Sequence, residues 1–236
     1  MSILITGGTS RLGRAFVRKA LQQGARVFFT YHRSASVARD LQNAGARGYL
    51  LDLADMAAIR SFAAAFQKEA GSLDVLIHNA AATADALIER MAETEWDRVL
   101  AVNLKAPFYL TRQLLPLLLM KERPSKVFTL VSRAGLSGLH GAVNYAASKG
   151  GLIAMTKTLA KELARNQILV NAINPGFMKS AMTENIPGAI FEKSLDESPL
   201  KAFSDPDEVA DFMVYLSSRR MRQVTGQVFH FESRPI

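Results

Sequence analysis

A chain of 236 residues without cysteine cannot form disulfides, bind a metal through thiolates or use a thiol nucleophile. Apolar residues make up 49% of the chain and charged residues 21%, which is typical of a folded globular protein and excludes a disordered one. The formal net charge of +8 favours anionic partners. However, the positive residues are dispersed, and the run Arg219-Arg220-Met221-Arg222 has no interleaved aromatic residues. An acidic cofactor or acidic carrier therefore fits the charge better than nucleic acid, which is not an expected partner.

The histidines and the apolar runs exclude further classes of protein. The four histidines, at positions 32, 78, 140 and 230, are too scattered to form a ligand cluster, so no metal is expected. No apolar run reaches the roughly 18 residues of a membrane span. The N-terminus leads directly into an apolar strand, without the charged region and cleavage site of a signal peptide. A soluble, cytoplasmic protein with no membrane partner is predicted.

The first elements of the chain predict a dinucleotide site. A short apolar run at residues 3–5 is typical of a strand buried on both faces of a parallel sheet. A turn with glycines follows, and then a helical pattern from Leu12 to Gln23, closed by Gly24. Gly7 permits a tight turn and Gly13 permits close packing where the helix starts. The free N–H groups and the positive dipole of the helix N-terminus would attract a pyrophosphate.

The end of the second predicted strand, residues 26–30, indicates which nicotinamide cofactor binds. A site for NAD places an acidic residue after this strand, where it accepts hydrogen bonds from the ribose hydroxyls. No acidic residue occurs between Arg26 and Arg39. Instead, Arg33, with Ser34 and Tyr31, can hold a 2′-phosphate through charge-assisted hydrogen bonds. NADPH is therefore expected rather than NADH; the alternative is that Arg33 is only an exposed loop residue.

The rest of the chain alternates strands and helices. Strands are predicted at 48–51, 74–77, 127–131, 168–173 and 226–231, and helices at 56–70, 93–119, 144–165 and 205–216. Residues 178–204 show no clear long element and are interpreted as a substrate lid. Without a repeat or a linker, this alternation predicts one α/β domain over residues 1–236. Its fold class is a Rossmann-type, doubly wound, mostly parallel sheet with helices on both faces, which binds ligands at the carboxyl ends of its strands.

The stretch from Ser132 to Lys149 carries the candidate catalytic residues. Tyr145 and Lys149 are four positions apart at the start of a predicted helix, so their side chains share a face. The ammonium group is expected to lower the pKa of Tyr145 toward neutrality. Ser132 follows a buried strand, and a loop with three glycines can return its hydroxyl to Tyr145. The three side chains would suit proton transfer at a substrate oxygen, although the Tyr–Lys spacing alone also fits a contact on a solvated helix face.

Six motifs resemble, in order, those of the short-chain dehydrogenase/reductase family. They are Thr6–Gly13, Asp52-Leu53, His78–Ala81, Val102–Leu104, Ser132 with Tyr145 and Lys149, and Asn174–Gly176. The resemblance spans about residues 2–231 and implies a fourth catalytic residue, Asn103, which holds a water in a proton relay. A purely structural role is the alternative for Asn103, because a polar side chain in an apolar helix needs partners.

The resemblance also implies how the cofactor is bound. Asp52 would contact the adenine, and the segment after Pro175 and Gly176 would border the nicotinamide. The implied set is Gly7, Thr9, Ser10, Arg11, Leu12, Gly13, Tyr31, Arg33, Ser34, Asp52, Leu53, Asn79, Ala80, Ala81, Tyr145, Lys149, Pro175, Gly176, Met178 and Ser180. Two positions depart from the family pattern, because Arg11 and Ala81 replace glycines. Arg11 can either crowd the pyrophosphate or bind a phosphate of the cofactor.

Within the family, the chain is most similar to the 3-oxoacyl-[acyl carrier protein] reductases. This similarity implies an NADPH-dependent reductase of an acyl thioester, in which Tyr145 protonates the forming alkoxide, Ser132 polarises the carbonyl and Lys149 holds the ribose. It also implies that Arg123 and Arg165, near the rim of the site, dock an acidic acyl carrier protein. The alternatives are an NADP-dependent dehydrogenase of a free alcohol, sugar or steroid, and a non-catalytic nucleotide-binding regulator. The intact catalytic set disfavours the regulator.

Two predicted helices, 93–119 and 145–165, suggest self-association. Their apolar residues include Leu114, Leu115, Leu117, Leu118, Leu152, Ile153, Met155 and Leu159. One face of a sheet is not expected to bury all of them, and monomers rarely expose large apolar patches. The family resemblance implies that these helices pair across a twofold axis. A homotetramer or a homodimer is expected; the alternative is a helix fully buried within one subunit.

Overall fold

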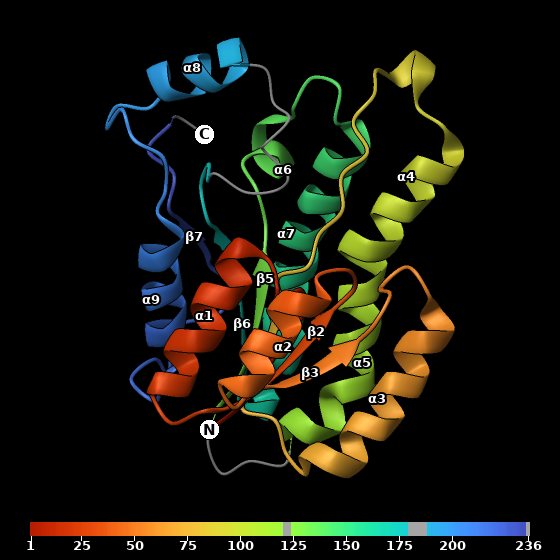
Figure 1. The fold of residues 1–236 in the computed structure, drawn as a ribbon, viewed down its shortest axis with the longest axis vertical. Helices are drawn as coiled ribbons and strands as arrows, with labels where there is room; N and C mark the ends of the chain where they lie inside the picture. Colours follow the sequence, from red (N-terminus) through yellow and green to blue (C-terminus); the bar gives the residue numbers. More distant parts are fainter. Residues whose placement is uncertain (120–123, 179–187, 235–236) are drawn as a thin grey trace.

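In the computed structural model of the protein, residues 1–119, 124–178 and 188–234 are described. They form a sheet of seven parallel strands in the order β3-β2-β1-β4-β5-β6-β7 (Figure 1). The strands are β1 Ser2–Ile5, β2 Arg26–Tyr31, β3 Arg47–Leu50, β4 Val75–His78, β5 Ser125–Leu130, β6 Ile168–Asn174 and β7 Val228–His230. The predicted doubly wound α/β fold class is therefore confirmed.

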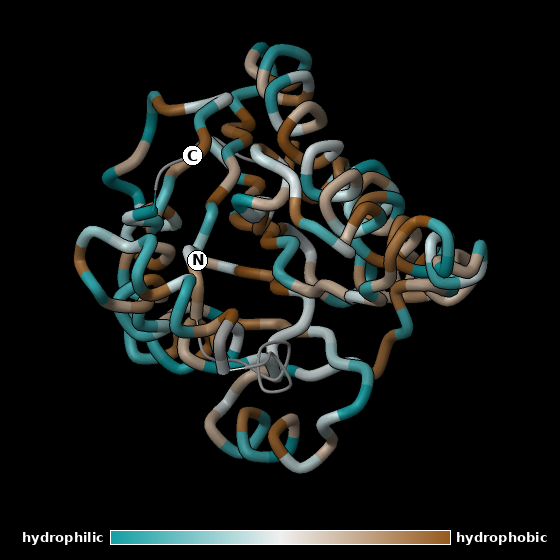
Figure 2. Tube along the Cα trace, turned by 90° about the horizontal axis from the view of Figure 1, so that it is seen from above, coloured by the Kyte–Doolittle hydropathy of each residue, from teal (hydrophilic) through white to brown (hydrophobic). Residues whose placement is uncertain are grey.

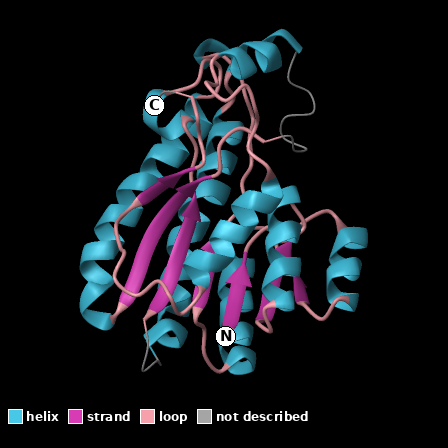
Figure 3. Cartoon of the chain, turned by 90° about the vertical axis from the view of Figure 1, so that its left-hand side faces the viewer, coloured by secondary structure: helices cyan, strands magenta, loops and turns pink. Residues whose placement is uncertain are grey.

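Helices cover both faces of this sheet (Figures 1 and 3). The helices of the described residues are α1 Arg11–Gln22, α2 Ala35–Asn43, α3 Met56–Ala70, α4 Glu93–Leu100, α5 Ala106–Leu119, α6 Ala134–Ser137, α7 Val143–Leu163, α8 Gly188–Asp196 and α9 Pro206–Ser217. On one face α1, α2 and α9 bury Phe16, Leu41 and Met213. On the other face α3 and α5 bury Phe66 and Leu114, and α7 packs beside them. Within the described ranges, every helix is too short or too polar to cross a bilayer.

The sequence forms this sheet because its strands are nearly continuous apolar runs. Every residue of β1, β4, β5 and β6 is buried, as expected for parallel strands with helices on both faces. Figure 2 shows hydrophobic residues along the interior of the molecule and hydrophilic ones on its outer turns. The strand order reverses between β1 and β4. At such a switch point, the carboxyl ends of the strands form a crevice for a ligand.

The structure corrects three expectations from the sequence. First, residues 188–196, where no element was expected, form α8, because Phe191 packs against Phe177 and Phe203, which lie outside the helix. Second, α2 was not predicted. Third, the segment 93–119 is not one uniform α-helix, because a π-helical segment, Ala101–Lys105, separates α4 from α5.

The apolar residues expected to remain uncovered are largely buried within the chain. Five of the eight are buried: Leu114, Leu117, Leu118, Leu152 and Ile153. The other three, Leu115, Met155 and Leu159, are partly buried against the same hydrophobic clusters. The helices achieve this because they pack on each other as well as on the sheet. That argument for self-association is therefore wrong, and an oligomer needs other support.

His78, at the end of β4, is a buried core histidine, as the sequence suggested. Its Nε2 lies 2.8 Å from Thr111 Oγ1, while Nδ1 has no hydrogen-bond partner among the described residues. Burial lowers the pKa of His78 from 6.5 to about 3. Between these pH values the unfolded chain binds a proton that the folded chain does not bind, so stability falls as the pH falls.

We therefore expect the free energy of unfolding to decrease below pH 6.5, by about 2 kcal/mol at about pH 5 through His78 alone, since each pH unit is worth about 1.4 kcal/mol. Urea titrations at about pH 7 and about pH 5 would measure the decrease. The His78→Asn variant keeps a polar group for Thr111 but cannot take up the proton, so it should lose about 2 kcal/mol less. Equal losses in both proteins would contradict this explanation.

Candidate active site

The turn between β1 and α1 has the geometry of a phosphate-binding loop. Gly7 has a φ of +66°, and a Cβ there would lie 2.9 Å from Ala80 Cα. A Cβ at Gly13 would clash with the Gly7 carbonyl oxygen, so only glycine fits at that position. Ser10 caps α1, and its Oγ accepts a hydrogen bond from Gly13 N at 3.0 Å. The remaining N–H groups of the first turn form a site suited to a pyrophosphate.

Asn79, just after β4, holds this loop in place. Its Nδ2 donates to the carbonyl oxygens of Thr6 and Gly7, at 2.9 Å each, and lies 3.1 Å from Ser10 Oγ. Because β1 and β4 meet at the switch point, the loop lies where parallel sheets bind ligands. The structure thus brings the predicted residues of the turn between β1 and α1 together with Asn79 and its neighbours, which follow β4.

The other residues of the loop have different roles. Leu12 is buried in the core, so its backbone rather than its side chain is available to a cofactor. Thr9 and Ala81 are half-buried. Arg11 is the exposed first residue of α1, and its φ is not positive. Position 11 therefore does not need the backbone freedom of glycine, which explains how arginine is accommodated there.

Ser132, Tyr145 and Lys149 meet at the carboxyl end of β5. Ser132 is hydrogen-bonded to the Tyr145 side chain. Lys149 Nζ lies 5.5 Å from the centre of the Tyr145 ring and donates to the Leu130 carbonyl oxygen at 2.6 Å. A Cβ at Gly135 would lie 2.6 Å from Gly150 N, so α6 packs closely on α7 and returns Ser132 to Tyr145. The glycine loop thus does what the sequence predicted.

The pKa of Tyr145 differs from the expectation. Burial raises this pKa and the Asp85 carboxylate raises it as well, while the hydrogen bond with Ser132 lowers it, and the net change is upward. The expected lowering is wrong, because burial and the Asp85 carboxylate outweigh the influences that lower this pKa. Burial also lowers the pKa of Lys149 to about 8. Tyr145 therefore keeps its proton at neutral pH and is available as an acid.

Asn103 is buried in the π-helical segment between α4 and α5. Its Oδ1 accepts from Ala82 N at 2.7 Å, and its Nδ2 donates to Ala82 O at 2.9 Å and lies 3.1 Å from Ser148 Oγ. Ser148 Oγ in turn donates to the Tyr145 carbonyl oxygen at 2.7 Å. These bonds support the structural role of Asn103, which holds the loop after β4 against α7. The water relay stays a prediction.

Two further residues of the site, Asn144 and Asp85, were not predicted from the sequence. Asn144 Nδ2 donates to the Ala84 carbonyl oxygen at 2.9 Å, and Ala86 forms a β-bridge with Ala142. These contacts tie the loop on both sides of Asp85 to the start of α7, which is why the Asp85 carboxylate influences Tyr145. The position of Asn144 directly before Tyr145 was a usable signal, whereas nothing local marked Asp85.

The residues expected at the adenine end of the cofactor lie at the carboxyl ends of β2 and β3. Arg33 and Ser34 are exposed, and Ser34 makes no side-chain cap bond to α2. Asp52 Oδ1 accepts from Ala54 N at 2.9 Å, and its Oδ2 lies 3.7 Å from His32 Nε2. Tyr31 is half-buried, and Leu53 is buried in the core. The one acidic side chain among them, Asp52, follows β3. No acidic residue lies between Arg26 and Arg39, where β2 ends.

The predicted nicotinamide end follows β6. Gly176 has a φ of +75°, and a Cβ there would clash with the Phe231 carbonyl oxygen, so glycine is required. Pro175 and Met178 are half-buried at this edge of the sheet. Ser180 lies outside the described residues.

Of the two arginines expected to dock a carrier protein, Arg165 is not near the site of its own chain. Arg165 follows α7 and is exposed close to the start of β6, at the amino edge of the sheet. Because α7 starts at the carboxyl edge with Tyr145 and runs back along the strands, its end lies on the opposite side from the site. The expected place of Arg165 at the rim is thus wrong within one chain, and Arg123 lies outside the described residues.

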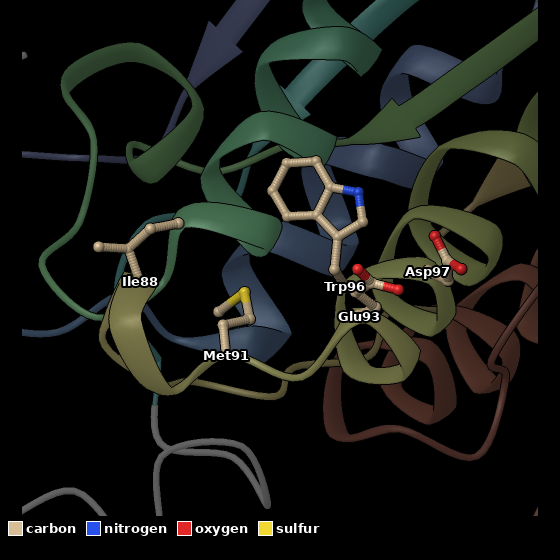
Figure 4. A pocket seen from close by; sticks show the side chains of 5 residues that line it. All are labelled: Ile88, Met91, Glu93, Trp96 and Asp97. Atoms are coloured by element: carbon tan, nitrogen blue, oxygen red, sulfur yellow. The ribbon is translucent and has the colours of Figure 1, made fainter.

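Two surface hollows lie along α4, away from these residues. One, of about 360 Å³, is lined by Ile88, Met91, Glu93, Trp96 and Asp97 (Figure 4). The other, of about 690 Å³, is lined by Asp97, Leu100, Ala101, Leu104, Lys105, Phe108 and Met155. Neither contains Ser132, Tyr145 or a residue of the glycine loop. In the ranges that the structure covers, no group of three or more His, Asp or Glu side chains could hold a metal ion.

A parallel sheet with a phosphate-binding loop at its switch point and a Ser-Tyr-Lys cluster beside it defines a nucleotide-dependent oxidoreductase of the Rossmann type. The family model described as Enoyl-(Acyl carrier protein) reductase matches residues 8–233. The chain is also similar to proteins named 3-oxoacyl-[acyl-carrier-protein] reductase. The one from Thermotoga maritima is 39% identical over 230 residues, which cover 95% of this chain and 93% of the relative. The one from Buchnera aphidicola is 34% identical over 228 residues, 96% of this chain and 93% of the relative.

Among solved structures, the Pseudomonas aeruginosa RhlG/NADP active-site complex matches with a TM-score of 0.90 at 30% identity, over 98% of this chain and 94% of that one. The chain therefore belongs to the short-chain dehydrogenase/reductase family. It is an NAD(P)-dependent oxidoreductase that acts on CH–OH or C=O groups.

Proposed function

We propose that the protein is an NADPH-dependent reductase that converts a 3-oxoacyl thioester, carried by an acyl carrier protein, to the 3-hydroxyacyl form. The observation that carries the proposal is the hydroxyl pair of Ser132 and Tyr145 at the carboxyl end of β5, where burial raises the pKa of Tyr145. Both hydroxyls can hydrogen-bond to one carbonyl oxygen. The names of the relatives supply the substrate class, since they cover most of the chain at 39% and 34% identity.

The cofactor site fits a dinucleotide. Gly7 and Gly13 leave room that a Cβ would fill, and Asn79 braces the loop, so the first turn of α1 can receive the pyrophosphate. Arg33 and Ser34 would hold the 2′-phosphate, and Lys149 the nicotinamide ribose. When bound, the reduced nicotinamide supplies the hydride for the carbonyl carbon.

The protein's own residues manage the proton on the substrate oxygen. Ser132 donates a hydrogen bond that polarises the carbonyl, and Tyr145 gives its proton to the oxygen as negative charge develops there. Lys149, whose pKa is lowered to about 8 by burial, lies one helical turn away and can return a proton to this region. In our proposal, Asn103 completes the route to solvent through a water.

The proposal is tested by initial rates of NADPH oxidation with matched substrates. Acetoacetyl thioesters of an acyl carrier protein and of N-acetylcysteamine should be reduced, the former with the lower KM. Free ketones, sugars and steroids represent the dehydrogenase alternative, and a 2-enoyl thioester represents the reaction named in the family model's description. Turnover of only one of these others, with no reduction of either 3-oxoacyl thioester, would contradict the proposal.

Cofactor preference gives a second expected result. The parent protein should have a higher kcat/KM with NADPH than with NADH, because Arg33 is an exposed cation at the end of β2 with no acidic residue beside it in the sequence. Arg33→Asp should reduce the preference at least about tenfold, by repelling the 2′-phosphate. If Arg33→Ala has no effect and Arg11→Ala does, the phosphate is bound by the glycine loop instead.

The protein is also proposed to act as a homodimer or homotetramer. The hollow of about 690 Å³ between α4 and α7 is lined mostly by apolar residues. At its edge Phe108 is 43% exposed, and beside the neighbouring hollow Ile88 is 73% exposed. Another copy of the same face would cover these side chains and support α7, which carries Tyr145 and Lys149.

Light scattering should give a mass that is two or four times 25.8 kDa. Phe108→Asp should dissociate this particle and lower its activity, because the charge cannot be buried in an apolar contact. Leu50→Asp is the matched control, since Leu50 is 68% exposed on β3, away from the hollow. A fully active particle of 25.8 kDa in the parent protein would contradict the proposal.

A further inference from the structure

Arg133, the residue after Ser132, connects the active site to a distant part of the chain. Its guanidinium group lies 3.2 Å from the Glu197 carboxylate. Glu197 directly follows α8, in the stretch 188–204, which we call the α8 segment. Arg133 Nε is buried and has no hydrogen-bond partner among the described residues, so the side chain is held inward beside the loop that carries Ser132.

The base of the α8 segment is fixed on the C-terminal tail. Ser198 Oγ lies 2.5 Å from Ser233 Oγ, and Ser204 Oγ donates to the Phe231 carbonyl oxygen at 2.7 Å. Ser204 N donates to the Phe177 carbonyl oxygen at 3.0 Å. The tail and the stretch after Gly176 therefore anchor the segment where it returns to the sheet.

The tail itself is made rigid by a paired charge. Arg234 bonds Glu232 through two nitrogens, at 2.8 and 2.7 Å, and these side chains are only 10% and 4% exposed. The Arg234 guanidinium also lies over the Phe177 ring, 5.1 Å from its centre. Burial raises the pKa of Glu232, but Arg234 and the nearby charge of Arg133 lower it below its ordinary value. The positive charge of Arg133 thus acts on two carboxylates, those of Glu197 and Glu232.

We propose that Arg133 is a positioning residue for the reaction: its ion pair with Glu197 holds the α8 segment over the carboxyl ends of β5 and β6, where it encloses the acyl chain of the substrate. Figure 1 shows α8 beyond these strand ends, on the same side as α6. The substrate part of this inference rests on the proposed function. The structural part, that Arg133 restrains α8, does not.

Hydrogen–deuterium exchange of the backbone amides of α8 tests the structural part without any substrate. In Arg133→Gln and in Glu197→Gln, these amides should exchange two- to fivefold faster, the change expected for loss of a partly exposed ion pair. The double variant should exchange no faster than either single variant, because each removes the same contact. Arg133→Lys should recover most of the protection. Asp196→Asn is the matched control: it breaks the ion pair with Lys201 inside the segment, and should not change the exchange.

Kinetics test the substrate part. The two single variants should raise the KM for the acyl thioester two- to fivefold while leaving the Kd for NADPH within about twofold. Unchanged exchange in both single variants overturns the restraint, and faster exchange with an unchanged KM overturns the positioning role. If the parent protein reduces no thioester, the proposed function fails, but the exchange experiment still decides whether Arg133 restrains α8.

Discussion

Tyr145→Phe is expected to lower kcat for carbonyl reduction about a thousandfold, or about 4 kcal/mol of activation free energy, which is the usual scale of general acid catalysis. The substitution removes one oxygen atom, the atom that is hydrogen-bonded with Ser132 and that holds the proton for the substrate. The ring and its packing remain. Cofactor binding should therefore stay within about threefold, which fluorescence titration with NADPH would measure.

The control for this substitution is Tyr215→Phe, which removes the same atom from an exposed tyrosine on α9. It should leave kcat unchanged. If Tyr145→Phe retains more than about a tenth of the parent kcat, Tyr145 is not the proton donor, because an acid catalyst contributes at least about a hundredfold.

Gly13→Ala is expected to have the second largest effect, on cofactor binding. A Cβ at this position would lie 2.9 Å from both Gly8 Cα and Ser10 Oγ and would clash with the Gly7 carbonyl oxygen. Gly8 Cα and the Gly7 carbonyl oxygen belong to the backbone of the loop, which Asn79 holds through its bonds to the Thr6 and Gly7 carbonyl oxygens. Moving the loop to relieve the overlap should cost about 1–3 kcal/mol. The Kd for NADPH should rise at least about tenfold, and the melting temperature should fall.

Gly188→Ala is the matched control, because a Cβ there would meet nothing within 4 Å and its φ is not positive. Isothermal titration calorimetry with NADPH and thermal melting of both variants would separate the cofactor effect from a general loss of stability. Parent-like affinity in Gly13→Ala would show that the loop can relax, and that its close packing is not needed for binding.

The fold could be predicted from the sequence because its signals are local. Strands such as β1 and β6 are apolar runs, and Gly24, with a φ of +72°, ends α1 where the sequence indicated. The α8 helix could not be predicted in the same way. It depends on Phe191 meeting Phe203, 4.3 Å away between ring centres, and on a tail that is distant in the chain.

The candidate site, too, was predictable only where its signals are local in the sequence. The helical spacing of Tyr145 and Lys149 and the close packing at Gly135 were sufficient to bring the candidate catalytic side chains together. The direction of the tyrosine pKa shift was not predictable, because it depends mainly on burial and also on Asp85 from another loop. The position of Arg165, in contrast, follows from the pattern alone, because a helix that starts at the carboxyl edge of a parallel sheet ends at the amino edge.

Transfer of deuterium from the cofactor to the substrate tests the central claim most directly. NADPH deuterated at C4 of the nicotinamide would be incubated with the protein and the acetoacetyl thioester, and the product analysed by mass spectrometry and NMR. We predict a 3-hydroxybutyryl thioester with one deuterium on C3, and no labelled product from Tyr145→Phe in the same time. Unlabelled thioester from the parent protein, or deuterium transferred only to a 2-enoyl thioester or a free ketone, would contradict the claim.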